Sequence, residues 1–366
     1  PQETGASDSW TDIKQIQFSR GDRTGMLLAP RTAAKGRPWL WSAAPPTHDG
    51  IHKALLDRGF HVAWIDVNDL YGNAEALSHW DVFYEWAVNE QQLSGKPALL
   101  GTEEDALALF SWAARHPDAA GCLYAQDPWL DLQPVPDPAS PVLEKVRHAH
   151  GCVSGTEATS LPDAPLNKAT EFGKAAIPIL FLHLGEEAAS PVRKQAEQFY
   201  KAYRLAGQGS FETITAADNP LLEDGLTLHV VHFILKNTGQ LPTAKPGEPL
   251  AQMTAWAMAD FSGSAGIHVL NDILIIETGN DMSGVLWQGD VPKMDYEITL
   301  DAMRLSGNDF FCGLTAPWGE SSFSLIVGGW GGTCIGISSL DWLDAYNNET
   351  ARFRSLESHR WYPVKL

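Results

Sequence analysis

The sequence is poor in basic residues and has no basic cluster. Lys and Arg number 26 against 45 Asp and Glu, so the formal net charge at neutral pH is 26 − 45 = −19. Binding to a nucleic-acid phosphate backbone draws on basic patches, which argues against a nucleic-acid partner. Apolar runs are also short, and none approaches the roughly 18 residues that a membrane-spanning helix needs. We therefore expect no nucleic-acid partner and no membrane span.

Cysteine is scarce, and metal and nucleotide motifs are lacking. The four cysteines form no C-x-x-C pair, which argues against a zinc ribbon or a thioredoxin-type site. Cys312 and Cys334 lie in neighbouring strand-like segments and could be cross-strand partners, but two small buried apolar residues are the favoured interpretation. No H-E-x-x-H, EF-hand or P-loop pattern occurs. We therefore predict no metal and no cofactor.

Length and composition indicate a globular protein. Of the 366 residues, 44% are hydrophobic and 19% are charged, so neither a largely disordered chain nor a fibre is expected. The length suggests roughly two domains, each large enough for a core of its own. The polar opening Pro1-Gln2-Glu3-Thr4 is typical of a mature end left by processing, or of an artificial boundary of the sequence. From it we expect a secreted or periplasmic protein.

Residues 1–238 alternate short apolar strands with amphipathic stretches. This alternation predicts an α/β domain with a doubly wound, mostly parallel sheet that helices cover on both faces. The predicted strands are Ile13–Phe18, Gly25–Leu28, Trp39–Ala43, His61–Ile65, Ala98–Gly101, Gly121–Ala125, Pro178–His183 and Phe211–Ile214. The predicted helices are Ile51–Arg58, Ala74–Gln91, Asp105–His116, Pro191–Ala206 and Gly225–Lys236.

The amino-acid composition changes after residue 238. Residues 239–255 have the Pro, Gly and Thr content of a linker. Residues 256–366 contain short β-branched or aromatic segments between Gly and Asn clusters, which predicts an antiparallel, jelly-roll-like β-sandwich. Its final segment, Trp361–Leu366, either pairs with an existing edge or leaves the sandwich truncated. The other predicted strands are Gly266–Ile276, Gly284–Gln288, Asp295–Leu300, Phe310–Thr315, Phe323–Val327 and Cys334–Ile337.

The segment Gly101-Thr102-Glu103-Glu104-Asp105 joins a predicted strand to a predicted helix. The order of strands resembles the α/β-hydrolase fold, whose Ser nucleophile lies on such a turn, written G-x-S-x-G. Glu103 stands in the place of the Ser, and Asp105 stands where a Gly is expected. A carboxylate does not perform acyl-serine chemistry, and a Cβ crowds a turn of this kind. The sequence therefore argues against a serine hydrolase.

The other two triad positions are also substituted. In the loop after the strand that ends at His183, the acid position is an alanine, although Glu186 and Glu187 are close to it. The loop after the last strand contains Asp218 and no histidine. His229 and His232 come later, on the terminal helix, and we expect them to be helix-surface or core residues. Each loss costs orders of magnitude in rate, so the whole triad is expected to be inactive.

Several segments of the first domain resemble the exported α/β-hydrolase-like proteins of planctomycete-type bacteria. The resemblance covers roughly residues 10–238 and implies the hydrolase fold. That family has a Ser elbow and an oxyanion-side loop after the third strand, and here the loop reads Ser42 to Gly50. The segments are Trp39-Leu40-Trp41, Ala54 to Val62, Asp66-Val67, Leu70-Tyr71-Gly72-Asn73 and Trp112 to Pro117.

An unorthodox set of carboxylates stays open as an alternative. Polar residues at the carboxyl ends of parallel strands lie where α/β sheets place ligands, and such a cluster could bind a cation or act as an acid/base pair. A solvated acidic rim is the favoured interpretation in a chain of this charge. The residues concerned are His48, Asp49, Glu103, Glu104, Glu186, Glu187 and Asp218.

The C-terminal part carries a second resemblance, to the concanavalin-like sandwich family named for 3-keto-disaccharide hydrolase. It lies in Leu274 to Gly279, Gly284 to Trp287, Asp295 to Ile298, Asn308 to Thr315, Val327 to Gly332 and Asn347 to Thr350. Tryptophan faces could stack on sugar rings, and polar neighbours could bind hydroxyl groups. For Trp287 and Trp330 a place in the core is the favoured interpretation. The binding residues predicted here are Trp287, Asn308, Asp309, Trp318, Trp330 and Trp342.

Two hypotheses of function follow. The first is a non-catalytic binding or scaffold protein, with a triad-less hydrolase-like domain joined to a carbohydrate-binding-like sandwich. The second is a secreted hydrolase of carbohydrate esters or glycosides that uses carboxylates. The partner is expected to be a carbohydrate, or another protein chain that completes the sandwich. The first hypothesis fails if a Ser or Cys lies within hydrogen-bonding reach of a His in an accessible cavity of the first domain.

Overall fold

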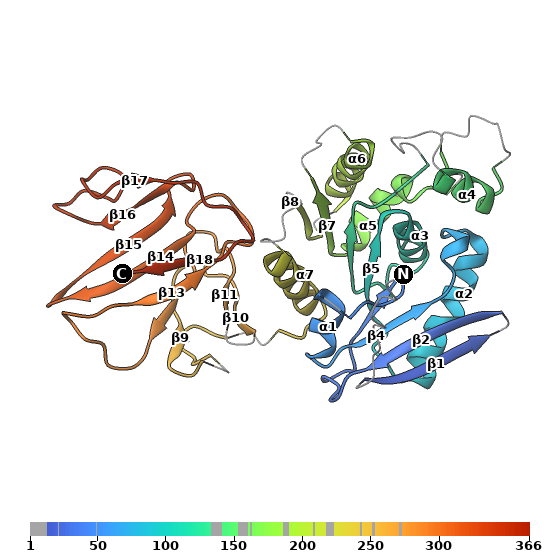
Figure 1. The fold of residues 1–366 in the computed structure, drawn as a ribbon, viewed down its shortest axis with the longest axis horizontal. Helices are drawn as coiled ribbons and strands as arrows, with labels where there is room; N and C mark the ends of the chain where they lie inside the picture. Colours follow the sequence, from blue (N-terminus) through green and yellow to red (C-terminus); the bar gives the residue numbers. More distant parts are fainter. Residues whose placement is uncertain are drawn as a thin grey trace, which may run out of the picture. The chain divides into compact units, whose positions relative to one another are not determined.

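The computed structural model describes residues 13–20, 22–48, 50–132, 141–152, 160–161, 163–185, 190–207, 209–216, 223–241, 244–250, 253–270 and 273–366. The chain divides into two compact units (Figure 1). The first, here the α/β unit, comprises Pro1–Pro220 and Val230–Gln240. The second, here the β-rich unit, comprises Leu221–His229 and Leu241–Leu366.

The α/β unit is built on one eight-stranded sheet. The strand order is β1-β2-β4-β3-β5-β6-β7-β8. β1 pairs with β2 and β2 with β4 in antiparallel fashion, and every later pairing is parallel. The mostly parallel sheet is therefore as predicted. The strands are β1 (Lys14–Arg20), β2 (Arg23–Ala29), β3 (Trp39–Ser42), β4 (His61–Ile65), β5 (Ala98–Thr102), β6 (Cys122–Gln126), β7 (Ile179–Leu184) and β8 (Phe211–Ala216).

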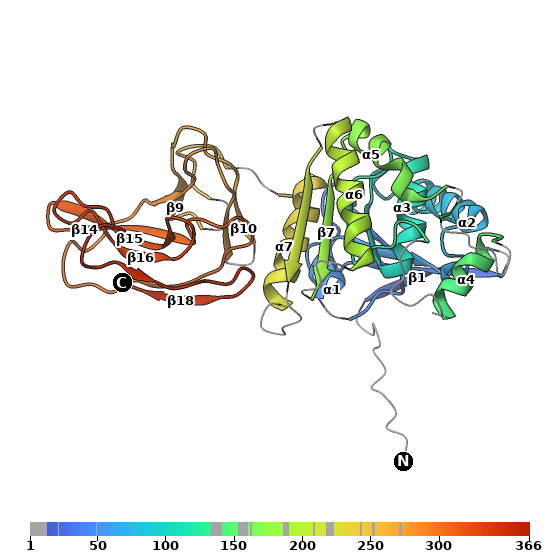
Figure 2. The same cartoon turned by 90° about the horizontal axis from the view of Figure 1, so that it is seen from above.

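Helices cover both faces of this sheet (Figure 2). Two of them begin at clear capping residues: Asn73 accepts hydrogen bonds from the N–H groups of Glu75 and Ala76, and Ser190 accepts one from Arg193. The structure also contains α4 and α5, which the sequence pattern did not predict. The α-helices are α1 (Gly50–Leu56), α2 (Ala74–Glu85), α3 (Ala106–Arg115), α4 (Pro141–Ala149), α5 (Ala169–Ala175), α6 (Pro191–Ala206) and α7 (Glu223–Asn237). The short helical segments are η1 (Asn68–Leu70), η2 (Trp86–Glu90), η3 (Glu103–Asp105) and η4 (Pro165–Lys168).

Aromatic side chains fill the core between this sheet and α2 and α3. Trp41 in β3 is fully buried, and its ring centroid lies 4.3 Å from that of Trp80 and 5.0 Å from that of Trp112. Trp39 stacks on the other side of Trp41 at 5.3 Å. Each ring removes a large apolar area from water, so this stack is a main source of stability for the unit.

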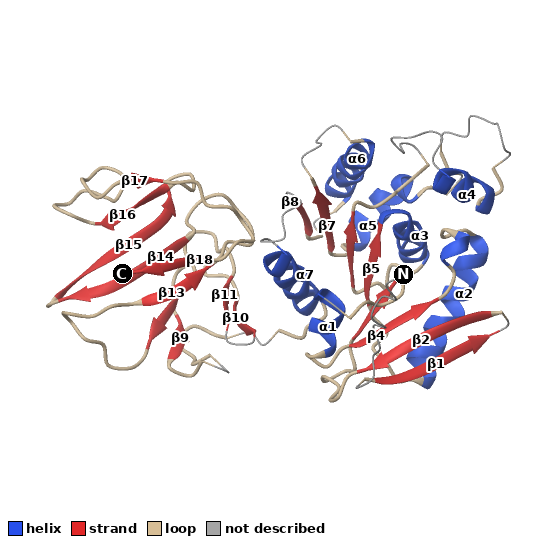
Figure 3. Cartoon of the chain, viewed as in Figure 1, coloured by secondary structure: helices blue, strands red, loops and turns tan. Residues whose placement is uncertain are grey.

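From β9 onward the described chain consists of strands and loops (Figure 3). All pairings in this part are antiparallel, as predicted, but they form several small sheets, and the jelly-roll-like sandwich stays a prediction. The sheets pair β9 (Trp256–Met258) with β12 (Val285–Trp287), β10 (Ile267–Leu270) with β11 (Ile273–Ile276), and β13 (Thr299–Ala302) with β18 (Tyr362–Lys365). A four-stranded sheet contains β14 (Cys312–Trp318), β15 (Ser321–Gly329), β16 (Cys334–Ser338) and β17 (Arg352–Phe353).

Two expectations about this part are settled by its pairings. The final segment does pair with an existing strand, because Tyr362 lies opposite Ala302 in the ladder of β18 and β13. Cys312 lies opposite Val327, and Cys334 lies opposite Gly329, so the two cysteines are not partners. All four cysteines are free. Among the described residues, no helix is both long and apolar enough to cross a membrane.

Candidate functional site

The elbow between β5 and α3 is a tight strand-to-helix turn with Glu103 at its first position. Glu103 has a φ of 45°, a left-handed backbone that residues other than Gly rarely adopt. Gly101 permits the turn, because a Cβ at that position would lie 3.1 Å from the Cα of Ala106. The turn geometry that presents a nucleophile in hydrolases is thus present, with a carboxylate in place of a hydroxyl.

Three carboxylates crowd this elbow, and the pKa values of Glu103 and Asp105 are raised there. Desolvation raises the pKa of Glu103, and the nearby charges of Glu104 and Asp127 raise it further. Burial also raises the pKa of Asp105 to about 7, with smaller contributions from Glu104 and Glu103. A hydrogen bond from Asn68 Nδ2 to Asp105 Oδ1, 2.8 Å long, opposes this shift. The carboxyl group of Asp105 can therefore donate or accept a proton near neutral pH.

Replacing Asp105 with Asn is expected to stabilise the protein at alkaline pH. The folded-state pKa of Asp105 is raised, so stability is lost as the pH rises from about 4 to about 7 and the buried carboxyl group ionises. After allowance for solvent screening, the gain at about pH 8 is expected to be about 2 kcal/mol in the free energy of unfolding, with little gain at about pH 4. Urea unfolding at both pH values measures it. Asp57→Asn, at an exposed position after α1, is the control, and an equal gain at both pH values would contradict the prediction.

An Asp–His pair with a buried histidine lies beside the elbow and was missed in the sequence. His183 Nδ1 lies 3.0 Å from Asp127 Oδ1, and the other oxygen of Asp127 accepts the N–H of Leu184 at 3.2 Å. His183 is buried with only 3% of its surface exposed, so it has little access to a ligand. The N–H of Trp129 donates to the carbonyl of Glu103, which ties the end of β6 to the elbow. Asp127 and His183 lie at the carboxyl ends of the neighbouring parallel strands β6 and β7. Because α/β sheets place ligands at these ends, this position is the signal from which the pair could have been predicted.

Ser42 and His52 form a contact between a hydroxyl group and an imidazole ring. Such a contact would favour a hydrolase if it lay in an accessible cavity. Ser42 Oγ lies 3.4 Å from His52 Nε2, and it donates to the carbonyl of Ala44 at 2.6 Å. Thr47 Oγ1 lies 3.2 Å from His52 Nδ1. Ser42 is 1% exposed and His52 is 8% exposed, so a substrate has no access to this hydroxyl. The pair holds the loop after β3 against α1 and does not meet the condition of an accessible cavity.

The remaining residues predicted for the first domain are not gathered into a described cluster. His48 lies in the loop between β3 and α1 and is half-buried. Asp49, Glu186, Glu187 and Asp218 lie outside the described residues. Of the acidic residues predicted at this edge, the described chain contains Glu103 and Glu104, and the structure adds Asp127 beside them.

In the β-rich unit, exposed aromatic rings form a row that includes one of the predicted tryptophans. The ring of Trp330 lies 5.9 Å from Phe310 and 6.2 Å from Tyr346, and Tyr346 lies 5.4 Å from Phe353. The side chains of this aromatic row are 55% (Phe310), 40% (Trp330), 47% (Tyr346) and 60% (Phe353) exposed. Trp330 is therefore not a core residue. It has a φ of 48° in its glycine-rich turn, which turns its ring outward.

The other predicted binding residues lie apart from the row or shape its backbone. Trp287 is 45% exposed, so it is not a core residue either, and its ring packs edge-on against Trp256 at 5.2 Å. Trp318 contacts Phe323, and Trp342 is almost fully exposed. Two polar residues lie at the base of the row. Asp309 Oδ1 accepts the N–H groups of Phe310 and Gly331, and a Cβ on Gly332 would lie 2.3 Å from the carbonyl oxygen of Asn308.

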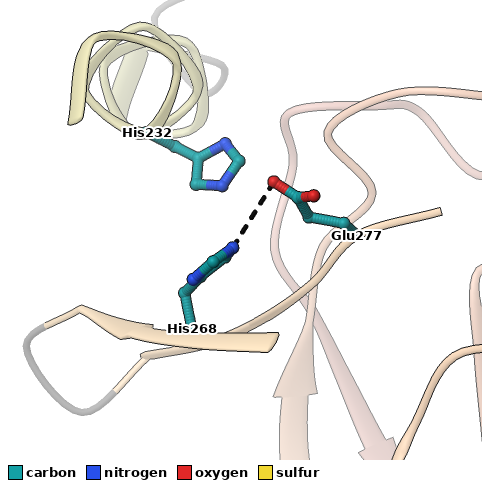
Figure 4. Close-up of side chains that lie close together, drawn as sticks. All are labelled: His232, His268 and Glu277. Atoms are coloured by element: carbon teal, nitrogen blue, oxygen red, sulfur yellow. Dashed lines mark ion pairs between the residues drawn. The ribbon is translucent and has the colours of Figure 1, made fainter. Parts of the chain in front are cut away.

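A His–Glu ion pair closes the hairpin of β10 and β11. His268 Nε2 lies 3.5 Å from Glu277 Oε1, the contact dashed in Figure 4. His268 is buried, and Gly266 leaves the space for its ring, since a Cβ there would lie 2.5 Å from His268 Nε2. A buried imidazole with a carboxylate partner is stabilised in place, so the pair fixes the end of this hairpin.

Comparison with known proteins finds solved structures of similar fold. No protein-family model and no curated protein matches the chain. Its fold is similar to a puromycin-hydrolysing peptidase of Mycobacterium tuberculosis, at 13% identity and a TM-score of 0.48 over 62% of this chain and 39% of that one. It is also similar to a lipase/esterase of Lactobacillus plantarum, at 11% identity and a TM-score of 0.45 over 63% and 99% of the two chains. An esterase of Pyrococcus furiosus gives 12% identity and a TM-score of 0.42 over 61% and 91%. The strand order and elbow described above give the first unit an α/β-hydrolase-like fold.

Proposed function

We propose that the protein is a non-catalytic binding protein that holds a carbohydrate chain along the aromatic row of its β-rich unit. The observation that carries this proposal is the row itself, in which four neighbouring rings remain between 40% and 60% exposed. Leaving a contiguous set of large rings in water is unfavourable for a protein without a ligand for them. Rings with one face free can stack on the apolar face of a sugar.

Polar groups beside the rings support a sugar ligand over a purely apolar one. Asn347 follows Tyr346 directly and donates both of its hydrogen bonds to the Asp344 carboxylate, at 3.0 and 3.1 Å. Asn308 and Asp309 precede Phe310 and are exposed. Amide and carboxylate groups next to an aromatic face bind hydroxyl groups, and this combination orients a sugar. Sugar polymers are met outside the cytoplasm, so the proposal includes a secreted or periplasmic location.

The α/β unit is proposed to act as a scaffold. Support comes from the elbow, where Glu103 replaces the nucleophile, and from Ser42, whose hydroxyl is buried and bonded to a carbonyl. A specific observation favours a second candidate function, carboxylate-based hydrolysis: Glu103 has a raised pKa and lies near the charge of Asp127. Retaining glycosidases use two carboxylates in this way, so an ester or a glycoside would be the substrate.

Co-sedimentation with insoluble cellulose, chitin and xylan tests the binding function. The wild-type protein is expected to be retained by at least one of these polymers. Trp330→Ala is expected to weaken that binding about fivefold or more, because truncating a central aromatic anchor typically costs over about 1 kcal/mol. Trp318→Ala is the matched control, since Trp318 is 62% exposed but lies outside the row. Equal losses in the two variants, or no retention by any polymer, would count against the proposal.

Hydrolysis of p-nitrophenyl esters and glycosides separates the two candidate functions. The scaffold interpretation expects no turnover by the wild-type protein. It also expects none from Glu103→Ser, because residues 215–221 of the loop that should carry the base contain no histidine. Turnover that Glu103→Gln abolishes would instead establish the carboxylate mechanism.

A further inference from the structure

A hollow of about 460 Å³ lies between β1 and the helix α2 with its extension η2. Figure 1 shows these elements side by side at the edge of the α/β unit. The volume falls within the range of small-molecule sites in proteins. β1 is the first strand in the sheet order and has a neighbouring strand on one side. The hollow is thus a concave surface beside a strand edge, away from the elbow after β5.

Two aromatic residues, Phe18 and Trp86, lie among the mostly polar residues that line the hollow. Phe18 is 8% exposed, and its ring centroid lies 5.1 Å from Trp86 and 5.2 Å from Phe83. Trp86 begins the π-helical segment η2, whose hydrogen bond runs from Gln91 N–H to the carbonyl of Trp86 at 3.1 Å. Short π-helical segments of this kind are frequent at functional sites. Trp86 is half-buried and Phe18 is buried, so Trp86 provides the accessible aromatic surface of the hollow.

The rim of the hollow carries charges of both signs. Arg20 follows Phe18 at a spacing of two in β1, which places both side chains on one face of the strand. Glu85 and Glu90 line the opposite wall. All three charged residues are exposed, and within the described chain none of their side chains is in an ion pair or a hydrogen bond. The hollow thus brings one cation and two anions around its two aromatic residues without letting them neutralise one another.

We propose that this hollow binds a small zwitterion with an apolar side chain, such as a free amino acid or a dipeptide. Arg20 would bind the carboxylate through its guanidinium, which suits that planar group. Glu85 and Glu90 would bind the ammonium group, and the side chain would rest on Trp86, whose ring packs against the buried Phe18. A ligand with only one charge leaves one wall of the rim unpaired, so the site should discriminate in favour of the zwitterion.

Isothermal titration of the full chain with three related probes tests this site. L-phenylalanine carries both charges, phenethylamine carries the ammonium alone, and hydrocinnamate carries the carboxylate alone. L-phenylalanine is expected to bind with a Kd below about 1 mM, and each single-charge analogue about tenfold or more weakly, because a charge-assisted hydrogen bond is lost. No heat of binding from L-phenylalanine up to about 10 mM would overturn the proposal, as would equal binding of phenethylamine.

Charge-removing variants show which wall binds which group. Arg20→Gln should weaken L-phenylalanine and hydrocinnamate and leave phenethylamine unchanged. Glu85→Gln should weaken L-phenylalanine and phenethylamine and leave hydrocinnamate unchanged. Arg115→Gln and Glu75→Gln are the matched controls, because both residues are exposed in the same unit and neither lines the hollow. All four positions lie at the surface, so the variants are expected to fold, and parallel losses in the controls would overturn the assignment.

Discussion

Trp41→Ala is expected to lower the free energy of unfolding of the α/β unit by about 3–5 kcal/mol, the range for truncating a fully buried large aromatic residue. The indole has no exposed surface and lies between the rings of Trp39 and Trp80. Neighbouring strands fix the backbone of β3 on both sides, so the walls of the resulting cavity cannot collapse fully. Urea unfolding followed by tryptophan fluorescence measures the loss.

Trp41→Phe is the matched control for this prediction. Within the described residues, the indole N–H of Trp41 is buried without a hydrogen-bond acceptor, which costs stability in the wild-type protein. Phenylalanine keeps a stacked ring and removes that unpaired donor, so its loss is expected to be under about 1.5 kcal/mol. A loss under about 1 kcal/mol for Trp41→Ala would mean that the aromatic stack does not support the sheet.

Elements with strong local signals were predicted well from the sequence. The strand His61–Ile65 and the helix Pro191–Ala206 have the predicted bounds, and the helix begins at the Ser190 cap with a proline at its first position. Where the signal was non-local, the prediction was wrong. The expected strand Asp295–Leu300 instead spans Thr299–Ala302, because its register is set by pairing with β18 at the far end of the chain. Asp295 itself has a left-handed backbone, which a strand excludes.

Two further predictions gave the wrong continuity or type of element. The segment Gly266–Ile276 was predicted as one strand, but it forms β10 and β11, which pair with each other in antiparallel fashion. The helix predicted over Ala74–Gln91 is interrupted, because its last part is the π-helical η2. Apolar content alone does not distinguish a long strand from a hairpin, or an α-helix from its π-helical extension.

The candidate sites were predictable only in part. Glu103 follows from the elbow pattern, because that pattern is local. The exposure of Trp330 could not be predicted from a local pattern. Its neighbours Phe310 and Tyr346 come from other parts of the chain and meet it only in the fold. Phe353, which completes the aromatic row, joins it through Tyr346 in the same way. A row assembled from separate loops and the short strand β17 has no sequence period that could reveal it.

The stability of the β-rich unit is expected to fall between pH 6.5 and about pH 4 because of His359. His359 is buried, and its Nε2 lies 3.1 Å from His229 Nδ1, with the two rings stacked at 5.4 Å. Desolvation lowers the pKa of His359 to about 4, the charge on His229 lowers it further, and a hydrogen bond to the carbonyl of Leu305 opposes the shift. The unfolded chain therefore binds a proton at a higher pH than the folded chain, so stability is complete above about pH 6.5 and is lost as the pH falls. The expected loss is about 2–3 kcal/mol, and urea unfolding at several pH values measures it.

His359→Asn isolates this contribution from other acid effects. His359 has a φ of 62°, and asparagine tolerates a left-handed backbone better than other non-glycine residues, so the turn should be kept. The variant removes the titrating ring. Its free energy of unfolding should therefore change less between pH 6.5 and about pH 4 than that of the wild-type protein. His61 in the α/β unit also has a pKa lowered to about 4 by burial, and its acid-induced loss remains in both proteins. A Cβ on Gly225 would lie 2.1 Å from the carbonyl oxygen of His359, so Gly225 permits close packing of helix α7 against this turn. If the free energy of unfolding depends on pH equally in the two proteins, the contact between His359 and His229 does not oppose protonation of His359.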